Sequence, residues 1–143
     1  MSDFRNYEKR FVEVDRNTEY YSDVLTNFDF HPQKYDLARL TNENAVKRSI
    51  RNLMMTSKYE RLFNPNLGSN IKKALFEPIG PISQLELKDA ITETIENFEP
   101  RAKLIDVTVT PYIDQQAYVI DILFYIINKA TPISFQTTLY RVR

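Results

Sequence analysis

The sequence predicts an α+β fold, in which N-terminal helices pack on a C-terminal, mostly antiparallel sheet of three to four strands. Two observations lead to this prediction. Apolar residues recur at the 3.6-residue spacing of a helix between about residues 43 and 98, and beyond residue 104 they alternate with a period of two. Helices followed by strands are the order typical of an α+β domain.

The first predicted helix covers about residues 43–56, with Thr41 or Asn42 as its N-terminal cap. A short second helix is predicted over about residues 70–76. The apolar stripe of the first helix follows the i, i+4, i+7, i+8 spacing of one face and is predicted to be core: Val46, Ile50, Leu53 and Met54.

A third helix is predicted to begin at Ser83, because Ser83 and Glu86 have the spacing of a capping box. Pro100 is predicted to end it, since the proline ring disfavours helical geometry at the preceding residue. Its apolar stripe is formed by Leu87, Ala90, Ile91, Thr94, Ile95 and Phe98.

Three strands are predicted after the helices. Ile105, Val107 and Val109 alternate with polar residues, which indicates a half-buried strand. The nearly unbroken apolar run at 117–127 predicts a central strand covered on both faces. A strand over about 133–142 then closes an antiparallel meander.

The chain of 143 residues is long enough for one domain with one core. Residues 1–40 mix aromatic and charged residues without a sustained period, and we expect them to form a partly extended N-terminal arm. Residues 41–143 are predicted to form a single domain. No repeat, low-complexity tract or linker divides this part of the sequence.

Composition excludes several classes of function. Nineteen basic and nineteen acidic residues give no net charge, so neither nucleic acid nor a membrane surface is an expected partner. No apolar stretch has the length of a membrane span. The chain has no cysteine, and its two glycines cannot build a glycine-rich phosphate loop. The chain has a single histidine, His31, which rules out a histidine pair.

No catalytic, cofactor-binding or metal-binding residue is predicted. Glu96 and Glu99 have the i, i+3 spacing that would place two carboxylates within the range a glycosidase uses. A solvated helix face with acids at this spacing would show the same pattern. A catalytic carboxylate pair and an ordinary solvated face are therefore both kept as interpretations.

The corner formed by Glu99, Pro100 and Arg101 is not explained by helix chemistry alone. A negative charge at a helix C-terminus is unfavourable by about 0.3–1 kcal/mol, because the helix dipole is negative there. In extended backbone Glu99 and Arg101 would project to the same side and form a local ion pair. Such a pair serves either the fold or a partner chain.

This corner, followed by the alternating strand at 105–109, resembles the Glu-Pro-Arg signature of the GPW/gene-25-like family. The resemblance covers about residues 45–127. It includes the segments 49–54 and 75–78 and four residues between 56 and 68: Arg61, Phe63, Pro65 and Gly68. Tyr59 departs from the family, which often has glycine there, and the arm before residue 40 has no counterpart.

The resemblance implies a structural subunit, not an enzyme, in the inner baseplate wedge of a contractile phage tail, to which a type VI secretion baseplate component is related. It implies location in the virion tail baseplate after assembly in the host cytoplasm. Multiple copies would form a ring-shaped assembly, joined to other baseplate wedge proteins and to the tail sheath protein. No cofactor is implied.

By the same resemblance, the partner-binding residues would be Glu99, Pro100 and Arg101 at the corner, with Leu139 and Arg141 in the last strand. That strand could offer an edge to which a sheath strand adds through backbone hydrogen bonds. Two alternatives remain open: a lysozyme-like cell-wall hydrolase, because the family carries that older label, and a small adaptor that binds one host protein.

Overall fold

The computed structural model describes residues 21–25, 28, 30–31, 35–127, 129 and 131–141. It contains two compact units, Met1–Asn42 and Glu43–Arg143. Within these described residues, no helix is long and apolar enough to cross a membrane.

The described part of the first unit consists of short antiparallel strand pairs. Strand β1 (Ser22–Val24) pairs with β4 (Arg39–Thr41), and β2 (Phe30–His31) pairs with β3 (Asp36–Leu37). The predicted extended arm therefore contains β-structure from residue 22 onward, and residues 1–20 lie outside the described residues.

Three helices precede the main sheet, as predicted: α1 (Asn42–Met55), α2 (Ile71–Phe76) and α3 (Pro81–Phe98). All four residues predicted as the core stripe of α1 are buried. On α3, the stripe is buried at Leu87, Ile91, Thr94 and Ile95.

Helix α3 begins two residues earlier than its predicted capping box. Pro81 occupies the first helical turn, where its fixed φ and missing N–H cause no loss. Ser83 is consequently inside the helix, and its Oγ accepts a hydrogen bond from the Gly80 N–H at 3.0 Å. The prediction that Ser83 is the cap residue is wrong. Ser83 is the third residue of the helix, and its hydroxyl satisfies the backbone N–H of the cap residue Gly80.

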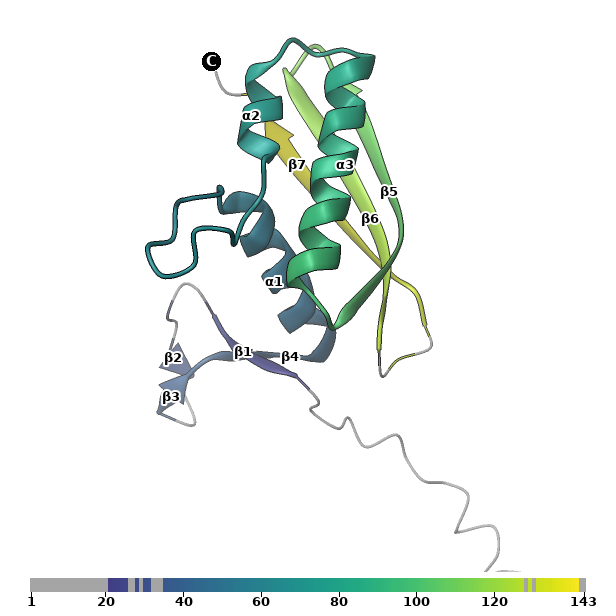
Figure 1. The fold of residues 1–143 in the computed structure, drawn as a ribbon. Coiled ribbons are helices and arrows are strands. Elements are labelled where there is room, and N and C mark those ends of the chain that lie inside the picture. The colour runs from purple at the N-terminus through teal and green to yellow at the C-terminus, as the bar shows by residue number, and fades with distance from the viewer. Residues whose placement is uncertain are drawn as a thin grey trace, which may run out of the picture. The chain divides into compact units, whose positions relative to one another are not determined.

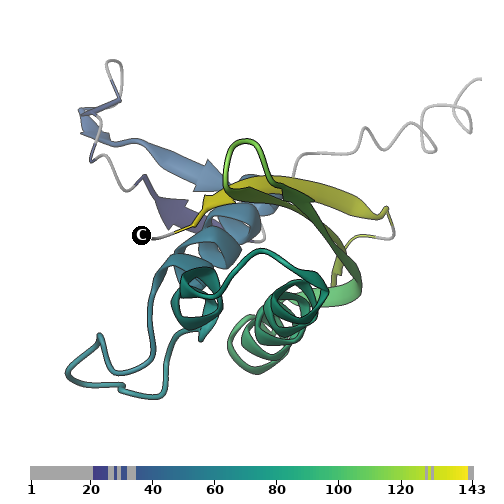
Figure 2. The same cartoon turned by 90° about the horizontal axis from the view of Figure 1, so that it is seen from above.

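The main sheet is a three-stranded antiparallel meander in the order β5-β6-β7, made of β5 (Ala102–Tyr112), β6 (Ala117–Ile126) and β7 (Ile133–Tyr140). The predicted α+β class and the central position of the second strand are confirmed. Viewed along the sheet, the three helices lie on one of its faces (Figures 1 and 2).

The central strand is not covered on both faces, and that prediction is wrong. Its burial alternates: Ile120, Ile122 and Phe124 are buried, whereas Leu123 and Tyr125 on the other face are each 37% exposed. The helices of this unit cover only one side of the sheet, so the apolar residues of the opposite face stay in contact with solvent.

A β-bulge in β5 makes the predicted alternation of buried and exposed residues wrong at Ile105. The register with β6 shifts between Leu104 and Asp106, which leaves Ile105 exposed. An extra residue of this kind is left out of the ladder pairing. Beyond the bulge, Val107 and Val109 are buried as the alternation predicted.

The core joins the buried faces of α1 and α3 to the inner face of the sheet. Its largest fully buried side chains include Ile50, Leu87, Ile91, Ile95, Tyr118, Ile120, Ile122 and Phe124. Tyr118 Oη lies 2.9 Å from Ser83 Oγ, so the one hydroxyl in this list has a hydrogen-bond partner.

The loop between α1 and α2 is fixed at its base by Ser69. The Ser69 N–H donates to the Thr56 carbonyl at 2.8 Å, and Ser69 Oγ donates to the Met54 carbonyl at 2.9 Å. Gly68 passes so close to the other side of the base that a Cβ there would lie 2.7 Å from the backbone carbonyl of Ser57. With φ at +137°, Gly68 is also in a region that side chains rarely adopt.

We expect Gly68→Ala to destabilise the protein by at least about 2 kcal/mol, because the methyl group meets backbone atoms that cannot move aside. Gly80→Ala is the matched control. No atom lies within 4 Å of a Cβ at Gly80, and its φ of −168° is ordinary extended backbone. Urea unfolding of both variants tests the prediction, and equal unfolding midpoints would contradict it.

Candidate functional site

Three residues turn the chain from α3 into β5. Glu99 is the C-terminal cap residue of α3, and its N–H donates to the Ile95 carbonyl at 2.9 Å. Its own carbonyl accepts from the Ala102 N–H at 3.1 Å, at the first residue of β5. The Arg101 carbonyl accepts from the Ile127 N–H at 3.2 Å, which ties the corner to the end of β6.

Glu99 and Arg101 form a bidentate ion pair at this corner. Arg101 Nε donates to Glu99 Oε1 at 2.6 Å, and a terminal nitrogen of Arg101 donates to Oε2 at 2.8 Å. The side chain of Glu99 is only 2% exposed, whereas that of Arg101 is 30% exposed. The local pair that the spacing predicted is present, but its acidic member is buried.

The electrostatics of the corner favour the charged carboxylate. Burial raises the pKa of Glu99, but the hydrogen bonds from Arg101 and Ser49 and the positive charge of Arg101 outweigh burial, so the net pKa is lowered. Ser49 belongs to α1. One carboxylate therefore connects α1, the end of α3 and the start of β5.

This geometry divides the roles of the three predicted corner residues. Glu99 is too buried to offer its carboxylate to a partner, and it positions Arg101 instead. Pro100 is exposed, and Arg101 keeps part of its side chain at the surface. The surface that the corner presents is thus formed by Pro100 and Arg101.

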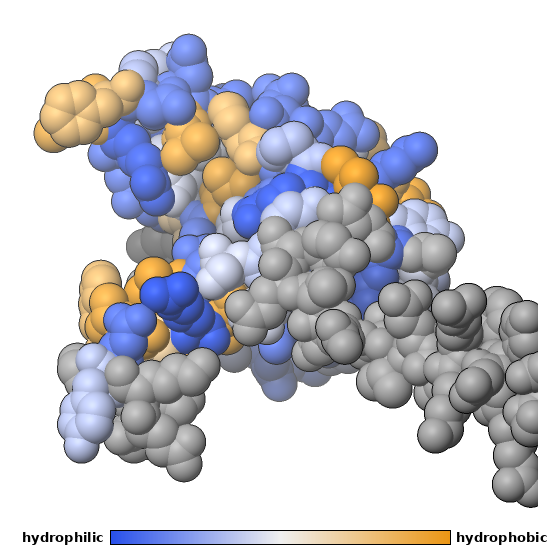
Figure 3. Space-filling view, turned by 90° about the horizontal axis from the view of Figure 1, so that it is seen from below, coloured by the Kyte–Doolittle hydropathy of each residue, from blue (hydrophilic) through white to orange (hydrophobic). Residues whose placement is uncertain are grey.

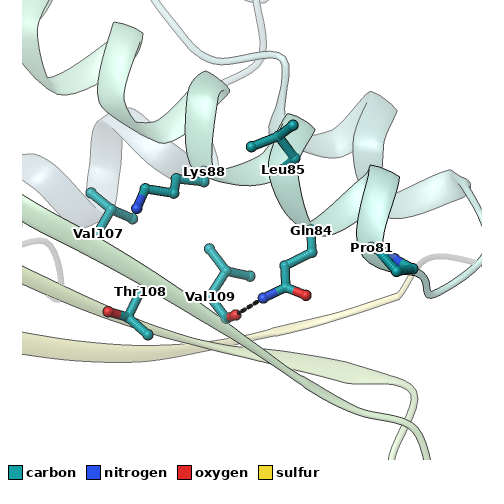
Figure 4. Close-up of a pocket in the computed structure, with 7 residues that line it drawn as sticks. All are labelled: Pro81, Gln84, Leu85, Lys88, Val107, Thr108 and Val109. Atoms are coloured by element: carbon teal, nitrogen blue, oxygen red, sulfur yellow. Dashed lines mark hydrogen bonds between the residues drawn. The ribbon is translucent and has the colours of Figure 1, made fainter.

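The β5 edge of the sheet is closed to further strand pairing. Gln84 of α3 donates its side-chain N–H to the Val109 carbonyl at 2.6 Å, as Figure 4 shows. Pro111 has no N–H to offer, and Lys88 of α3 forms an ion pair with Asp106 at 3.3 Å. Gln84, Lys88 and Val109 line a groove of about 260 Å³ between α3 and β5.

Among the residues that the structure describes, no strand pairs with the outer edge of β7, which is therefore called the open edge. The register of β7 with β6 identifies the backbone groups that face outward. The Arg141 N–H donates to the Gln116 carbonyl at 2.8 Å, so this residue directs its backbone toward β6. Alternate residues of a strand direct their backbone groups to opposite edges. The outward-directed residues are therefore Ser134, Gln136, Thr138 and Tyr140, all with exposed side chains.

The structure places the two predicted edge residues differently. The side chain of Leu139 is buried and is part of the core. Leu139 pairs with Tyr118, and its backbone groups are directed toward β6 and not toward the open edge. Arg141 follows β7 and is partly exposed, and its Nε is buried without a hydrogen-bond partner among the described residues. The four outward-directed residues were missed, because their direction depends on a register that only the folded sheet defines.

The two carboxylates weighed as a catalytic pair do not form one. Glu99 is paired with Arg101, whereas Glu96 is exposed on α3. A second groove of about 280 Å³ lies between α2 and α3 and is lined by Glu77, Glu86, Asp89 and Glu93 among others. In the part of the chain that the structure describes, no three His, Cys, Asp or Glu side chains are grouped so as to hold a metal ion.

We expect Glu99→Gln to lower stability at pH 7 by about 1–3 kcal/mol, because a charged acceptor of two guanidinium hydrogen bonds is lost. The folded-state pKa of Glu99 lies below its ordinary value of 4.5. The contribution of the carboxylate is thus present above about pH 4.5 and is lost as the pH falls through the folded-state pKa.

Urea unfolding of wild type and variant between pH 7 and pH 3 measures this effect, and the gap between them should close on acidification. Glu96→Gln, on the exposed face of the same helix, is the control and should match wild type. A gap of equal size at both ends of the pH range would refute the assigned role of the carboxylate.

Comparisons with known proteins identify a family for most of this chain. The family model for the baseplate wedge protein gp25 matches residues 41–129, more than half of the chain. The baseplate wedge protein gp25 of Enterobacteria phage T4 is 27% identical over 113 residues, which cover 79% of this chain and 85% of that relative.

Solved structures share the fold. A proposed tail lysozyme of Geobacter sulfurreducens has a TM-score of 0.67 at 24% identity, over 73% of this chain and 96% of that one. A chain of the anti-feeding prophage baseplate has a TM-score of 0.59 at 23% identity, over 85% of each chain.

The family match spans α1, the loop, α2, α3 and strands β5 and β6, and it includes the Glu-Pro-Arg corner. The chain therefore belongs to the baseplate wedge protein gp25 family.

Proposed function

We propose that this chain is a structural subunit of the inner baseplate wedge of a contractile phage tail, where it joins neighbouring wedge proteins and gives the tail sheath its starting point. Membership of the gp25 family supports the wedge role. The observation that supports the sheath role is the asymmetry of the sheet, with β5 closed and β7 open.

The corner contributes a rigid cationic contact. The bidentate bond to Glu99 restricts the rotamers of Arg101, so a partner binds a side chain that is already oriented. Pro100 beside it adds an exposed apolar ring with a fixed backbone. A neighbouring wedge chain with a carboxylate or carbonyl at this point would be recognised.

The open edge contributes a template for strand addition. Ser134, Gln136, Thr138 and Tyr140 direct backbone donors and acceptors away from β6, and an extended segment of the sheath protein can pair with them. In this proposal multiple copies form a ring in the virion baseplate after assembly in the host cytoplasm.

A hydrolase is the second candidate, because one structural neighbour is a proposed tail lysozyme. A glycosidase needs a carboxylic acid that keeps its proton near neutral pH, which requires a raised pKa. The pKa of Glu99 is lowered instead, and its two oxygens are bound to Arg101. The arrangement at the corner favours a structural role over a catalytic one.

The corner is tested by measuring the affinity of purified wedge subunits of the same tail for wild type, Arg101→Ala and Glu99→Gln. Arg101→Ala should lose binding by about tenfold or more, because the contact side chain is gone. Glu99→Gln should keep most of the binding, because Arg101 remains at the surface.

Both variants weaken the same ion pair, so they control for each other. If binding falls in parallel with the free energy of unfolding in both, the corner is only a fold device and the interface must be sought elsewhere. Affinities are compared at temperatures where each variant is fully folded by circular dichroism.

Strand addition is tested with Thr138→Pro, which removes one outward-directed N–H from the β7 edge and leaves the ladder to β6 intact. Sheath polymerisation seeded by the assembled baseplate should be lost while wedge binding persists. Removing the last five residues would be a poorer test, because that deletion also takes buried Leu139 from the core.

Thr138→Val is the matched control, since it alters the same exposed side chain and keeps the N–H. It should seed sheath as wild type does. Normal seeding by a folded Thr138→Pro baseplate, observed by electron microscopy, would defeat the strand-addition proposal.

A further inference from the structure

The loop from Ser57 to Ser69, between α1 and α2, is ordered by its own contacts. The Tyr59 N–H donates to the Pro65 carbonyl at 2.8 Å, and Glu60 Oε2 accepts from the Ser57 N–H at 2.8 Å. Tyr59 adopts the left-handed conformation with φ at +69°. A residue with a large side chain therefore holds a backbone conformation that costs free energy within this turn.

The tip of this ordered loop exposes two large apolar residues. Leu62 is 93% exposed and Phe63 is 101% exposed, so neither packs against the unit that carries it. The loop projects away from the helices, and hydrophobic side chains stand out from the molecular surface there (Figures 2 and 3). A pair of adjacent apolar residues on a protruding, hydrogen-bonded loop is typical of a binding surface and not of a core.

The charges of the loop are paired except at the tip. Lys58 contacts Glu93 at 3.4 Å, and Glu60 contacts Lys72 at 3.5 Å. Among the described residues no ion pair is found for Arg61, which is exposed beside Leu62. The tip thus combines two apolar side chains with one available positive charge.

The complementary surface is an apolar socket with an acidic rim. Two grooves among the described residues fit this description poorly. The groove between α3 and β5 has Lys88 as its charged residue, which would repel Arg61, and the groove between α2 and α3 is lined by four carboxylates with only alanines as apolar lining. A second copy is therefore a poorer occupant than a different chain with an apolar socket.

We propose that Leu62 and Phe63 form a preformed apolar plug that inserts into an apolar, acid-rimmed socket of another baseplate wedge subunit, with Arg61 pairing to the rim. This inference rests on the proposed wedge function. The order of the loop lowers the entropy lost on binding, because the backbone is fixed before the partner arrives.

The test uses the full chain and each of the other wedge subunits of the same tail, purified singly, with affinities measured by titration calorimetry. The double variant Leu62→Ser/Phe63→Ser should bind one of them at least about tenfold more weakly, with an unchanged melting temperature because both side chains are exposed. Ile113→Ser, also exposed but in the turn after β5, is the matched control and should bind as wild type does.

Arg61→Glu separates the charge from the plug. It should slow association and make affinity rise with added salt, because attraction to the acidic rim becomes repulsion. An affinity of the double variant equal to that of wild type would overturn the plug while leaving the wedge function intact. Failure of wild type to bind any wedge subunit would overturn the proposed function itself.

Self-association is measured in the same series by sedimentation velocity. Loss of a wild-type oligomer in the double variant, with affinities for the wedge subunits unchanged, would identify a second copy as the occupant and overturn the proposal. A monomeric wild type that binds one wedge subunit through this tip is the expected result.

Discussion

The contact between Glu99 and Arg101 is the constraint on which the placement of the other elements depends. Within three residues of one buried carboxylate α3 ends and β5 begins, and Ser49 brings α1 to the same point. A buried carboxylate without such donors is strongly unfavourable, so the three elements must meet in this arrangement for the charge to be accommodated. The acid that is unfavourable at a helix C-terminus is thus explained by its partners. The same contact leaves Arg101 oriented at the surface.

Features that depend on residues close together in the sequence could be predicted, and features that depend on distant segments could not. The helical stripes and the pair of Glu99 with Arg101 depend on residues a few positions apart, so periodicity and spacing were enough to find them. The exposed face of β6 and the bulge beside Ile105 depend on which neighbours cover or pair with a strand, and an apolar run does not encode this. Leu139 was assigned to the edge for the same reason. The direction of its side chain and backbone is fixed by the pairing of β7 with β6, two strands that are joined by a turn.

Helix α3 determines which edge of the sheet stays open. Its inner face completes the core through Leu87, Ile91 and Ile95, while Gln84 and Lys88 reach the side of β5. An exposed strand edge pairs readily with any extended chain, so closing one edge limits such pairing to the other. The helix that stabilises the domain therefore also gives the sheet a direction for growth. For a subunit proposed to begin a polymer, this asymmetry is more informative than the presence of an edge.

Several large apolar residues remain exposed on the surface of the folded unit. Leu123 and Tyr125 on the outer face of the sheet are each 37% exposed, whereas Leu62 and Phe63 on the loop are almost fully exposed and contribute little to the core of their own unit. Scattered apolar residues on a surface need no explanation, but adjacent ones on an ordered loop do, because a loop that served only as a connection would be polar and mobile. The hydrogen bonds of Ser69 and the close approach of Gly68 fix the base of this loop. The exposed residues at its tip add no packing that would stabilise the fold. Such order is consistent with a surface whose burial is completed only when another subunit covers it.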